Sequence, residues 1–254
     1  MNHASIKLSI LIPVKNEGIS IGIMLKFLKA VVEIPHEVLI IYDDPADDTI
    51  PVVKKAQLKY PNVRLVHNTL GKGASNAIRV GIDSAAGEYI LVLAADELLP
   101  LLAIESMIKL MDLGCDLVSC TRYAHGGKRL GGSWLPKTLS YIGNWIFHIF
   151  SGYVLTDATT GIKMFRKSLL KAIKLESAPI GWAIMYEIGI KAQAAGLQLG
   201  EVPIISIDRI YGGKSSFSFK YWFGEYLRWF FWGIKHLRRI KVKEPIVLSF
   251  PKNF

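Results

Sequence analysis

The chain has 254 residues with a formal net charge of +10 and 51% hydrophobic residues, a length that suits one α/β domain with an appendage or two small domains. Two cysteines exclude a disulfide scaffold and make a reducing compartment the default. The basic charge favours an anionic partner, whether nucleic acid, phospholipid headgroups or a phosphorylated substrate. No apolar run approaches the roughly 20 residues of a spanning helix, so we expect neither a transmembrane helix nor a signal peptide.

Strands and helices are predicted to alternate along the first half of the chain. Apolar runs indicate buried strands, and apolar residues at spacings of three and four indicate helices. The expected strands cover 7–12, 37–42, 62–66, 88–93 and 116–120, and the expected helices cover 19–32, 49–60, 73–85 and 101–111. Alternation with short loops predicts an α/β fold with a mostly parallel sheet and helices on both faces.

The pattern changes after residue 123. A glycine-rich loop that carries Lys128 and Arg129 comes first, and an amphipathic helix is expected at 135–149. The remaining expected segments are a loop and strand at 157–165, a helix at 181–195, a strand at 199–205, a Gly/Ser loop at 209–217 and a second amphipathic helix at 219–240.

Acidic residues follow three of the predicted strands. Glu17 comes after the first strand, Asp43 and Asp44 come after the second, and Asp96 comes after the fourth. The carboxyl ends of parallel strands meet at one edge of a sheet, where ligands bind in open α/β folds. Acids there suit hydrogen bonds to a base and ribose, or a divalent cation on a diphosphate. The alternative is that the acids at 43–48 are turn and N-cap residues.

A glycine loop at 71–73 follows the third predicted strand and opens a helix. Such a loop can cradle a phosphate at the helix N-terminus. It is not a P-loop, because no Gly-Lys-Ser/Thr follows, and it lacks the third glycine of a dinucleotide fingerprint. The loop by itself therefore indicates no particular ligand.

Several short segments together resemble a known family. Ile-Pro-Val-Lys-Asn-Glu at 12–17, the turn Asp43…Asp47-Asp48-Thr49 and Gly71-Lys72-Gly73-Ala74 resemble the nucleotide-sugar half of the family 2 inverting glycosyltransferases with the Rossmann-like GT-A fold. Within that family the chain looks like the dolichol- or polyprenyl-phosphate sugar synthases. The later segments that are similar are Thr121-Arg122-Tyr123 with Gly126-Gly127, 157–163, and Arg209 with 212–215. The resemblance covers about residues 7–220.

The resemblance implies a donor site at the sheet edge. Pro13 and Glu17 would border the base and ribose, and Asp43 would contact the base. Lys72 and Asp96 would complete the set of residues that bind the nucleotide sugar.

The family's Asp-X-Asp metal motif is only half present. Asp96 is its surviving acid, since Ala94 replaces the first one. Asp96 is expected to act in catalysis and to bind Mg²⁺ or Mn²⁺, with substrate phosphates as further ligands. Lys214, in the closing loop, would help to neutralise the diphosphate.

The resemblance also implies an acceptor site and a further catalytic acid. Arg122 would meet phosphate and take part in catalysis, and Lys137 and Asp157 are assigned to the acceptor with it. Glu187 falls where many relatives place a functional acid on a helix, and the alternative for it is an exposed helix-surface glutamate.

The chemistry depends on the acceptor. A phosphate monoester is already a nucleophile at pH 7, so the enzyme needs positioning and charge neutralisation rather than a strong base. A sugar hydroxyl would require a carboxylate base, for which Glu187 and Asp157 are the candidates. Attack opposite the leaving group inverts the anomeric centre.

The expected helix at 219–240 combines an apolar stripe with basic neighbours. Between 209 and 243 basic residues far outnumber acids, and Glu225 is the sole acid. Trp and Phe beside Lys and Arg favour a helix at a membrane interface, and the alternative is packing on the protein itself or a dimer contact. For the helix at 135–149 both interpretations stay open. The stripe consists of Phe219, Trp222, Phe223, Tyr226, Leu227, Phe230, Ile234 and Leu237.

We therefore expect a glycosyltransferase domain at 1–218, with a nucleotide-sugar half at 1–123 and an acceptor half at 124–218, and an interfacial helix and tail at 219–254. The expected activity is inverting transfer of a hexose from a nucleotide sugar to a polyprenyl- or dolichyl-phosphate lipid at the cytoplasmic face of an anionic membrane. The alternatives are transfer to a sugar hydroxyl and a catalytically reduced nucleotide-sugar-binding protein. No nucleic-acid motif is present, and a homo-oligomer is compatible with the sequence.

Overall fold

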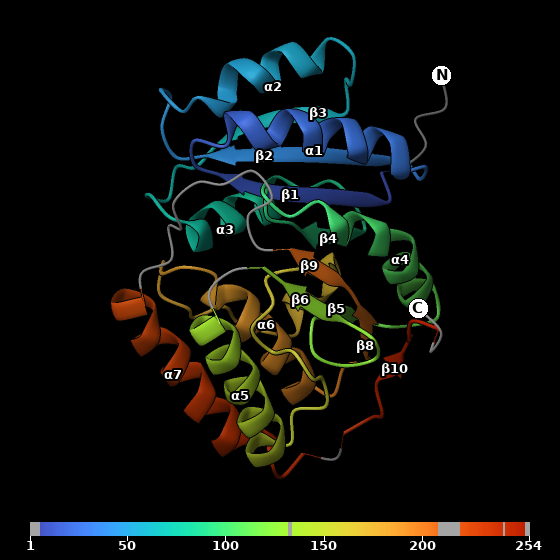
Figure 1. Cartoon of the computed structure of the whole chain (residues 1–254), viewed down its shortest axis with the longest axis vertical. Coiled ribbons are helices and arrows are strands. Elements are labelled where there is room, and N and C mark those ends of the chain that lie inside the picture. Colours follow the sequence, from blue (N-terminus) through green and yellow to red (C-terminus); the bar gives the residue numbers. More distant parts are fainter. Residues whose placement is uncertain (1–5, 132–133, 208–218, 241, 252–254) are drawn as a thin grey trace.

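A computed structural model describes residues 6–131, 134–207, 219–240 and 242–251. An eight-stranded sheet in the order β10-β8-β5-β7-β4-β1-β2-β3 runs through it (Figure 1). Every neighbouring pair is parallel except that β7 runs antiparallel to β4 and β5, so the predicted mostly parallel sheet is confirmed. The strands are β1 (Leu8–Val14), β2 (His36–Tyr42), β3 (Val63–His67), β4 (Tyr89–Val92), β5 (Leu117–Thr121), β7 (Lys163–Arg166), β8 (Leu199–Pro203) and β10 (Ile246–Val247).

A second, two-stranded parallel sheet pairs β6 (Lys128–Leu130) with β9 (Ile205–Ile207). The sequence predicts only a loop around β6, because three residues between glycines carry no periodicity. Pairing with β9, far away in the chain, makes this segment a strand.

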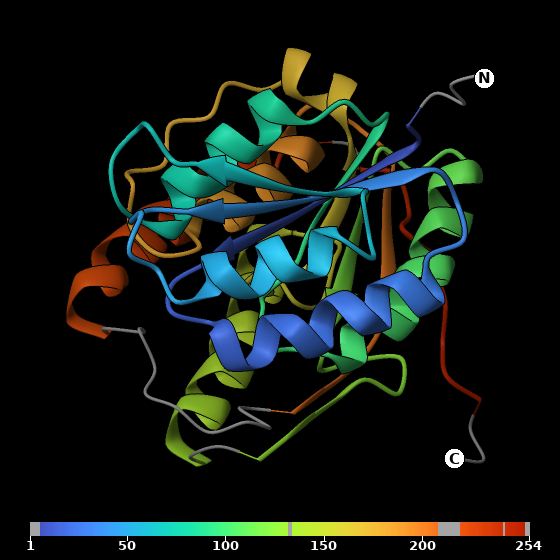
Figure 2. The ribbon, with the colours of Figure 1, turned by 90° about the horizontal axis from the view of Figure 1, so that it is seen from above.

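Helices cover both faces of the large sheet, because its central strands are apolar on both sides. In β1, Leu8, Ile10 and Ile12 point into one core, and Leu11 points into the other. Figure 2 shows α1 and α2 on one side of β1, β2 and β3, with α3 on the other. One face carries α1 (Gly18–Val31), α2 (Thr49–Gln57) and α4 (Ile104–Asp112) with the 3₁₀ turn η1 (Leu99–Ala103), and the other carries α3 (Ala74–Ser84), α6 (Ala183–Ala194) and the 3₁₀ turn η2 (Lys167–Lys171).

Two further helices form a third layer over α6. They are α5 (Trp134–Ser151) and α7 (Phe219–Leu237), which lie side by side in Figure 1. Every residue of α6 from Ala183 to Gln193 is buried, because the sheet covers one side and α7 covers the other.

Helix α7 turns most of its predicted membrane stripe inward. Tyr226 packs against Tyr186 of α6 with ring centroids 6.0 Å apart, and Phe230 lies 5.3 Å from Phe147 of α5. Leu237 is 1% exposed. The alternative of packing on the protein itself therefore accounts for this part of the stripe, while Phe223 remains exposed.

The apolar surface that faces solvent lies mainly on α5. Among the described residues no helix is long and apolar enough to cross a membrane. The exposed large apolar residues of α5, named here the α5 surface, are Trp134, Leu139, Tyr141, Ile142, Trp145, Ile149 and Phe150.

The chain after residue 218 is attached to the rest of the fold in two places. Helix α7 packs against α6 and α5, and β10 extends the large sheet by pairing with β8. The division into a domain at 1–218 and an interfacial segment remains a prediction.

Candidate functional site

The predicted donor edge is assembled by the order of the strands. Strands β4, β1, β2 and β3 are adjacent and parallel, so their carboxyl ends lie together. This brings Pro13 and Glu17 after β1, Asp43 after β2 and Asp96 after β4 to one edge of the sheet, as the sequence predicts.

Acids of the β2–α2 turn hold the loop that follows β1. Asp47 Oδ2 accepts a hydrogen bond from the Asn16 backbone nitrogen at 3.0 Å, and Asp48 Oδ1 accepts one from Gly18 at 2.9 Å. Asn16 has a positive φ of 57°, a conformation that asparagine tolerates better than most residues. For Asp47 and Asp48, the interpretation as turn residues is therefore confirmed.

Asp43 holds the glycine loop. Its Oδ2 accepts a hydrogen bond from the Gly73 backbone nitrogen at 2.8 Å, and its Oδ1 accepts one from Asn68 Nδ2 at 2.7 Å. Gly73 has a φ of 126°, which strains any residue with a side chain. Lys72 lies in the same loop, 3.2 Å from Asp44 with both side chains exposed. Contact of Asp43 and Lys72 with a nucleotide remains a prediction.

Asp96 and Glu17 are neighbouring, partly exposed acids at this edge. Burial raises the pKa of Glu17, a hydrogen bond from Ser20 lowers it, and the Asp96 charge raises it. In the described part of the chain, no three His, Cys, Asp or Glu side chains gather as a metal site. Asp96 with Glu17 nearby suits a divalent cation that takes its other ligands from a diphosphate and water. The predicted role of Asp96 as a metal ligand stays a prediction.

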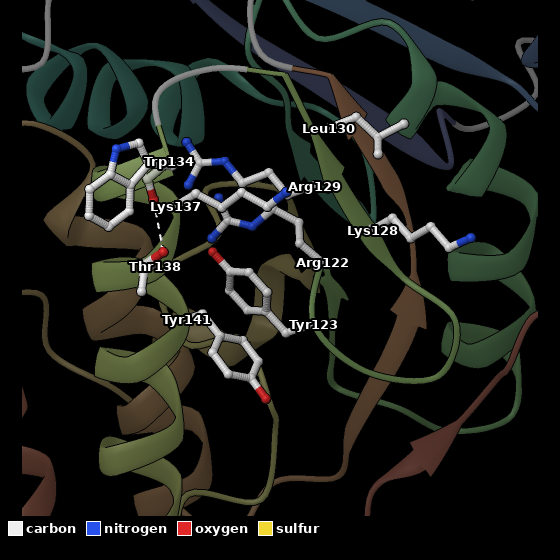
Figure 3. A pocket seen from close by; sticks show the side chains of 9 residues that line it. All are labelled: Arg122, Tyr123, Lys128, Arg129, Leu130, Trp134, Lys137, Thr138 and Tyr141. Carbon is white, nitrogen blue, oxygen red and sulfur yellow. Dashed lines mark hydrogen bonds between the residues drawn. The ribbon is translucent and has the colours of Figure 1, made fainter.

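A second site lies between β5, β6 and α5. It is a cavity of about 600 Å³ that contains both basic residues predicted for the acceptor. In Figure 3 the charged ends of Arg122, Arg129 and Lys137 lie near one another beside the first turns of α5, whereas Lys128 points to the opposite side. The lining residues of this acceptor pocket are Arg122, Tyr123, Lys128, Arg129, Leu130, Trp134, Lys137, Thr138 and Tyr141.

Arg122 is fixed in the pocket by Asp157. Its Nε and Nη2 donate to the two carboxylate oxygens at 2.7 and 2.9 Å, and its backbone nitrogen donates at 3.2 Å. Asp157 is fully buried. Burial alone would raise the pKa of Asp157, but the Arg122 guanidinium lowers it below its ordinary value. Asp157 therefore contacts the pocket through Arg122.

Helix α5 is tied to the same turn. Asn144 Oδ1 accepts a hydrogen bond from the Ala158 backbone nitrogen at 2.9 Å, and Asn144 Nδ2 donates to Thr159 Oγ1 at 2.9 Å. The Tyr123 hydroxyl donates to Ser140 Oγ of α5 at 2.8 Å. These bonds set the distance between the pocket's floor and its α5 wall.

Glu187 lies away from the surface that its alternative interpretation requires. It is fully buried, so an exposed helix-surface glutamate is wrong. Its carboxylate accepts a hydrogen bond from the Ser177 backbone nitrogen at 2.8 Å and pairs with Lys191 at 2.8 Å. These contacts give Glu187 a structural task, and its catalytic role remains a prediction. Lys214 and the loop at 209–217 lie outside the described residues.

The aromatic lining of the pocket escaped sequence reasoning. Tyr123, Trp134 and Tyr141 come from two segments whose separation hides their proximity. The available signal was a helix that mixes large aromatic residues with Lys137 in its first turns.

Comparison with known proteins gives a family. The model of the family described as Glycosyl transferase family 2 matches residues 9–174, well over half of the chain. A dolichol-phosphate mannosyltransferase of Pyrococcus furiosus is 28% identical over 200 residues, 78% of this chain and 55% of that protein, so the chain spans little more than half of that relative. An undecaprenyl-phosphate mannosyltransferase of Micrococcus luteus is 26% identical over 209 residues, 80% of this chain and 84% of that protein.

A solved structure supports the fold. Glucosyl-3-phosphoglycerate synthase from Mycobacterium tuberculosis, in complex with Mn²⁺, uridine diphosphate and phosphoglyceric acid, superposes with a TM-score of 0.68. The match covers 91% of this chain and 79% of that chain at 13% sequence identity. At this identity the likeness concerns the fold alone, and it confirms the predicted GT-A architecture.

Proposed function

This chain belongs to glycosyl transferase family 2, and we propose that it transfers a hexose, with inversion, from a nucleotide sugar to a polyprenyl- or dolichyl-phosphate lipid. The observation that carries the proposal is a basic pocket that opens beside an exposed apolar helix. Trp134 and Tyr141 belong both to the pocket lining and to the α5 surface. A lipid phosphate has the matching chemistry, an anionic head on an apolar chain.

Arg122 and Lys137 are the groups that would hold the acceptor phosphate. The phosphate oxygen attacks the anomeric carbon, the bond to the donor's diphosphate breaks, and the electron pair leaves with the nucleoside diphosphate. Fixed cations at both ends lower the barrier because they face charge without reorganising. Asp96 would hold Mg²⁺ or Mn²⁺, which neutralises charge on the diphosphate when bound.

The burial of two acids favours a phosphate acceptor over a sugar hydroxyl. Asp157 and Glu187 are the predicted candidates for a base, and both are fully buried and paired with a cation. A hydroxyl acceptor needs a base within hydrogen-bond reach, whereas a phosphate monoester does not.

A transfer assay tests the proposal. Labelled nucleotide sugars are incubated with a polyprenyl phosphate or with a sugar acceptor, with and without EDTA. Transfer to the lipid phosphate is expected. Transfer to the sugar hydroxyl alone would favour the second activity, and donor binding without turnover on either acceptor would favour a nucleotide-sugar-binding protein.

Lys137→Ala tests the acceptor pocket directly. Removal of one cation from a phosphate site is expected to raise the lipid-phosphate KM about tenfold and leave the donor KM unchanged. Lys26→Ala, an exposed lysine on α1, is the matched control and should behave like the wild type. An equal effect of both variants on the acceptor KM would contradict the assignment.

The proposal includes a peripheral position on the cytoplasmic face of an anionic membrane, with the α5 surface as the contact. Apolar and aromatic residues beside basic ones suit an interfacial helix. Trp145→Glu, at a side chain 56% exposed, is expected to weaken binding to anionic liposomes at low salt. Phe27→Glu, 46% exposed on α1, is the control. The membrane claim fails if the wild type shows no affinity for these liposomes.

A further inference from the structure

Strand β8 buries an acid that the donor edge and the acceptor pocket do not use. Glu201 is 1% exposed. Its Oε1 accepts hydrogen bonds from the backbone nitrogens of Thr156 at 2.8 Å and Asp157 at 3.3 Å, and its Oε2 accepts one from the Thr156 hydroxyl at 2.9 Å. A buried carboxylate is stable only with such partners, so Glu201 and the Thr156–Asp157 turn fix each other.

That turn is what holds Arg122 in the acceptor pocket. Three nitrogens of Arg122 donate to the Asp157 carboxylate, and the backbone nitrogen of Asp157 donates to Glu201. The guanidinium therefore depends on Glu201 through one intermediate residue. A shift of the turn would move the cation that faces the acceptor.

A chain of hydroxyl groups extends the network to the pocket wall. Thr156 Oγ1 lies 2.7 Å from Thr121 Oγ1, which accepts a hydrogen bond from the Tyr123 backbone nitrogen at 3.2 Å. While Glu201 is ionised, Thr156 donates to it and Thr121 donates to Thr156. A protonated Glu201 can donate to Thr156 instead, so the proton on Glu201 sets the direction of this chain.

His125 closes the network on its exposed side. Its Nε2 lies 3.3 Å from Glu201 Oε2. The loop around it is tight, because a Cβ on Gly127 would lie 2.4 Å from the Thr121 carbonyl oxygen. The Phe250 backbone nitrogen donates to the His125 carbonyl oxygen at 2.9 Å. The loop after Arg122 is thus held from both sides.

We propose that Glu201 is a positioning residue of the acceptor pocket, which sets the place of the Arg122 guanidinium through the Thr156–Asp157 turn and is itself held by His125. For the ligand of the pocket, a lipid monophosphate, this inference rests on the proposed function.

The charge of Glu201 gives the network a pH dependence. Burial raises the pKa of Glu201 to about 7, although hydrogen bonds from Thr156 lower it, and burial lowers the pKa of His125. As pH falls below about 7, Glu201 takes up a proton, accepts the backbone hydrogen bonds less strongly and holds the turn less firmly. The titratable groups that face Glu201 are His125, Asp157, Lys163, Tyr153 and Cys120.

Nuclear magnetic resonance of ¹⁵N-arginine-labelled protein tests the positioning without any substrate. The Nε–Hε signal of Arg122, assigned by its loss in Arg122→Lys, is expected to shift with a midpoint near pH 7 in the wild type. Glu201→Gln keeps the shape of the side chain but does not titrate, so the signal should stay constant. Glu105→Gln, an exposed acid on α4, should keep the wild-type curve.

A second variant covers a failure of Glu201→Gln to fold. His125→Asn changes a loop residue, removes the group that can pair with the Glu201 charge, and should move the midpoint upward. An Arg122 signal that does not titrate between about pH 5.5 and about pH 8.5 in the wild type, or that titrates alike in the wild type and both variants, overturns the inference.

Kinetics supply the functional readout. At every pH, Glu201→Gln should show the acceptor KM that the wild type reaches only at low pH, about fivefold above its value at high pH. The donor KM should not change. If the wild type transfers no sugar to a lipid phosphate, the proposed function fails, while the Arg122 titration still decides the role of Glu201.

Discussion

The donor edge and the acceptor pocket are built in opposite ways. At the donor edge, partly exposed acids such as Asp43 and exposed ones such as Asp48 accept hydrogen bonds from backbone nitrogens of neighbouring loops. At the acceptor pocket, a fully buried acid, Asp157, carries a guanidinium that is itself largely buried. Water can replace a lost contact in the first site, whereas in the second the partner left behind keeps an uncompensated charge.

This difference bears on what each site can tolerate. Exposed loops can adjust to a ligand at small cost, since their backbone groups can bind water. A buried ion pair keeps one geometry or loses several kcal/mol. We therefore expect the donor edge to adapt to its nucleotide and the acceptor pocket to present Arg122 in a fixed position.

The largest expected effect tests the buried pair. Asp157→Ala leaves Arg122, with a side chain 13% exposed, without its carboxylate, and should lower the free energy of unfolding by about 3–5 kcal/mol. Urea denaturation measures it. Asp112→Ala breaks the exposed pair with Lys7 and should cost less than about 1 kcal/mol. Equal losses in the two variants would remove the difference between the sites.

The next effect uses the pH dependence of stability. Glu201 has a pKa of about 7 in the folded protein against an ordinary value of 4.5. A raised folded-state pKa contributes stability that is complete below the unfolded pKa and is lost as pH rises through the folded one, here about 3 kcal/mol in total. Between about pH 5 and about pH 8, the unfolding free energy of Glu201→Gln should therefore rise relative to that of the wild type. A constant difference between the two proteins would contradict the raised pKa.

The smallest effect is expected at the donor edge. Asp43→Ala removes the acceptor for Gly73 and Asn68, but both donors can reach water, so stability should fall by only about 1 kcal/mol. Donor affinity should fall more clearly, and thermal-shift titration with nucleotide sugars measures it. Asp83→Ala, an exposed acid at the far end of α3, should change neither quantity. A stability loss as large as that of Asp157→Ala would show that the donor edge is as rigid as the pocket.

The elements of the fold were predicted well where the pattern is local. The helices at 135–149 and 219–240 correspond to α5 and α7, because helical periodicity depends only on neighbours in the chain. What covers an apolar stripe does not. Tyr226 and Phe230 were expected at a membrane, yet α6 and α5 cover them, and the exposed aromatic surface lies on α5 instead.

The sequence by itself determined the strand order's consequence at the donor edge. Parallel strands bring Glu17, Asp43 and Asp96 to one edge whatever the details of packing. Only the tertiary structure decided that Arg122 rests on Asp157 and that Glu201 stands behind both. These side chains come from separate segments, and whether a charge is buried, paired or free depends on the surrounding layers, which no local pattern records.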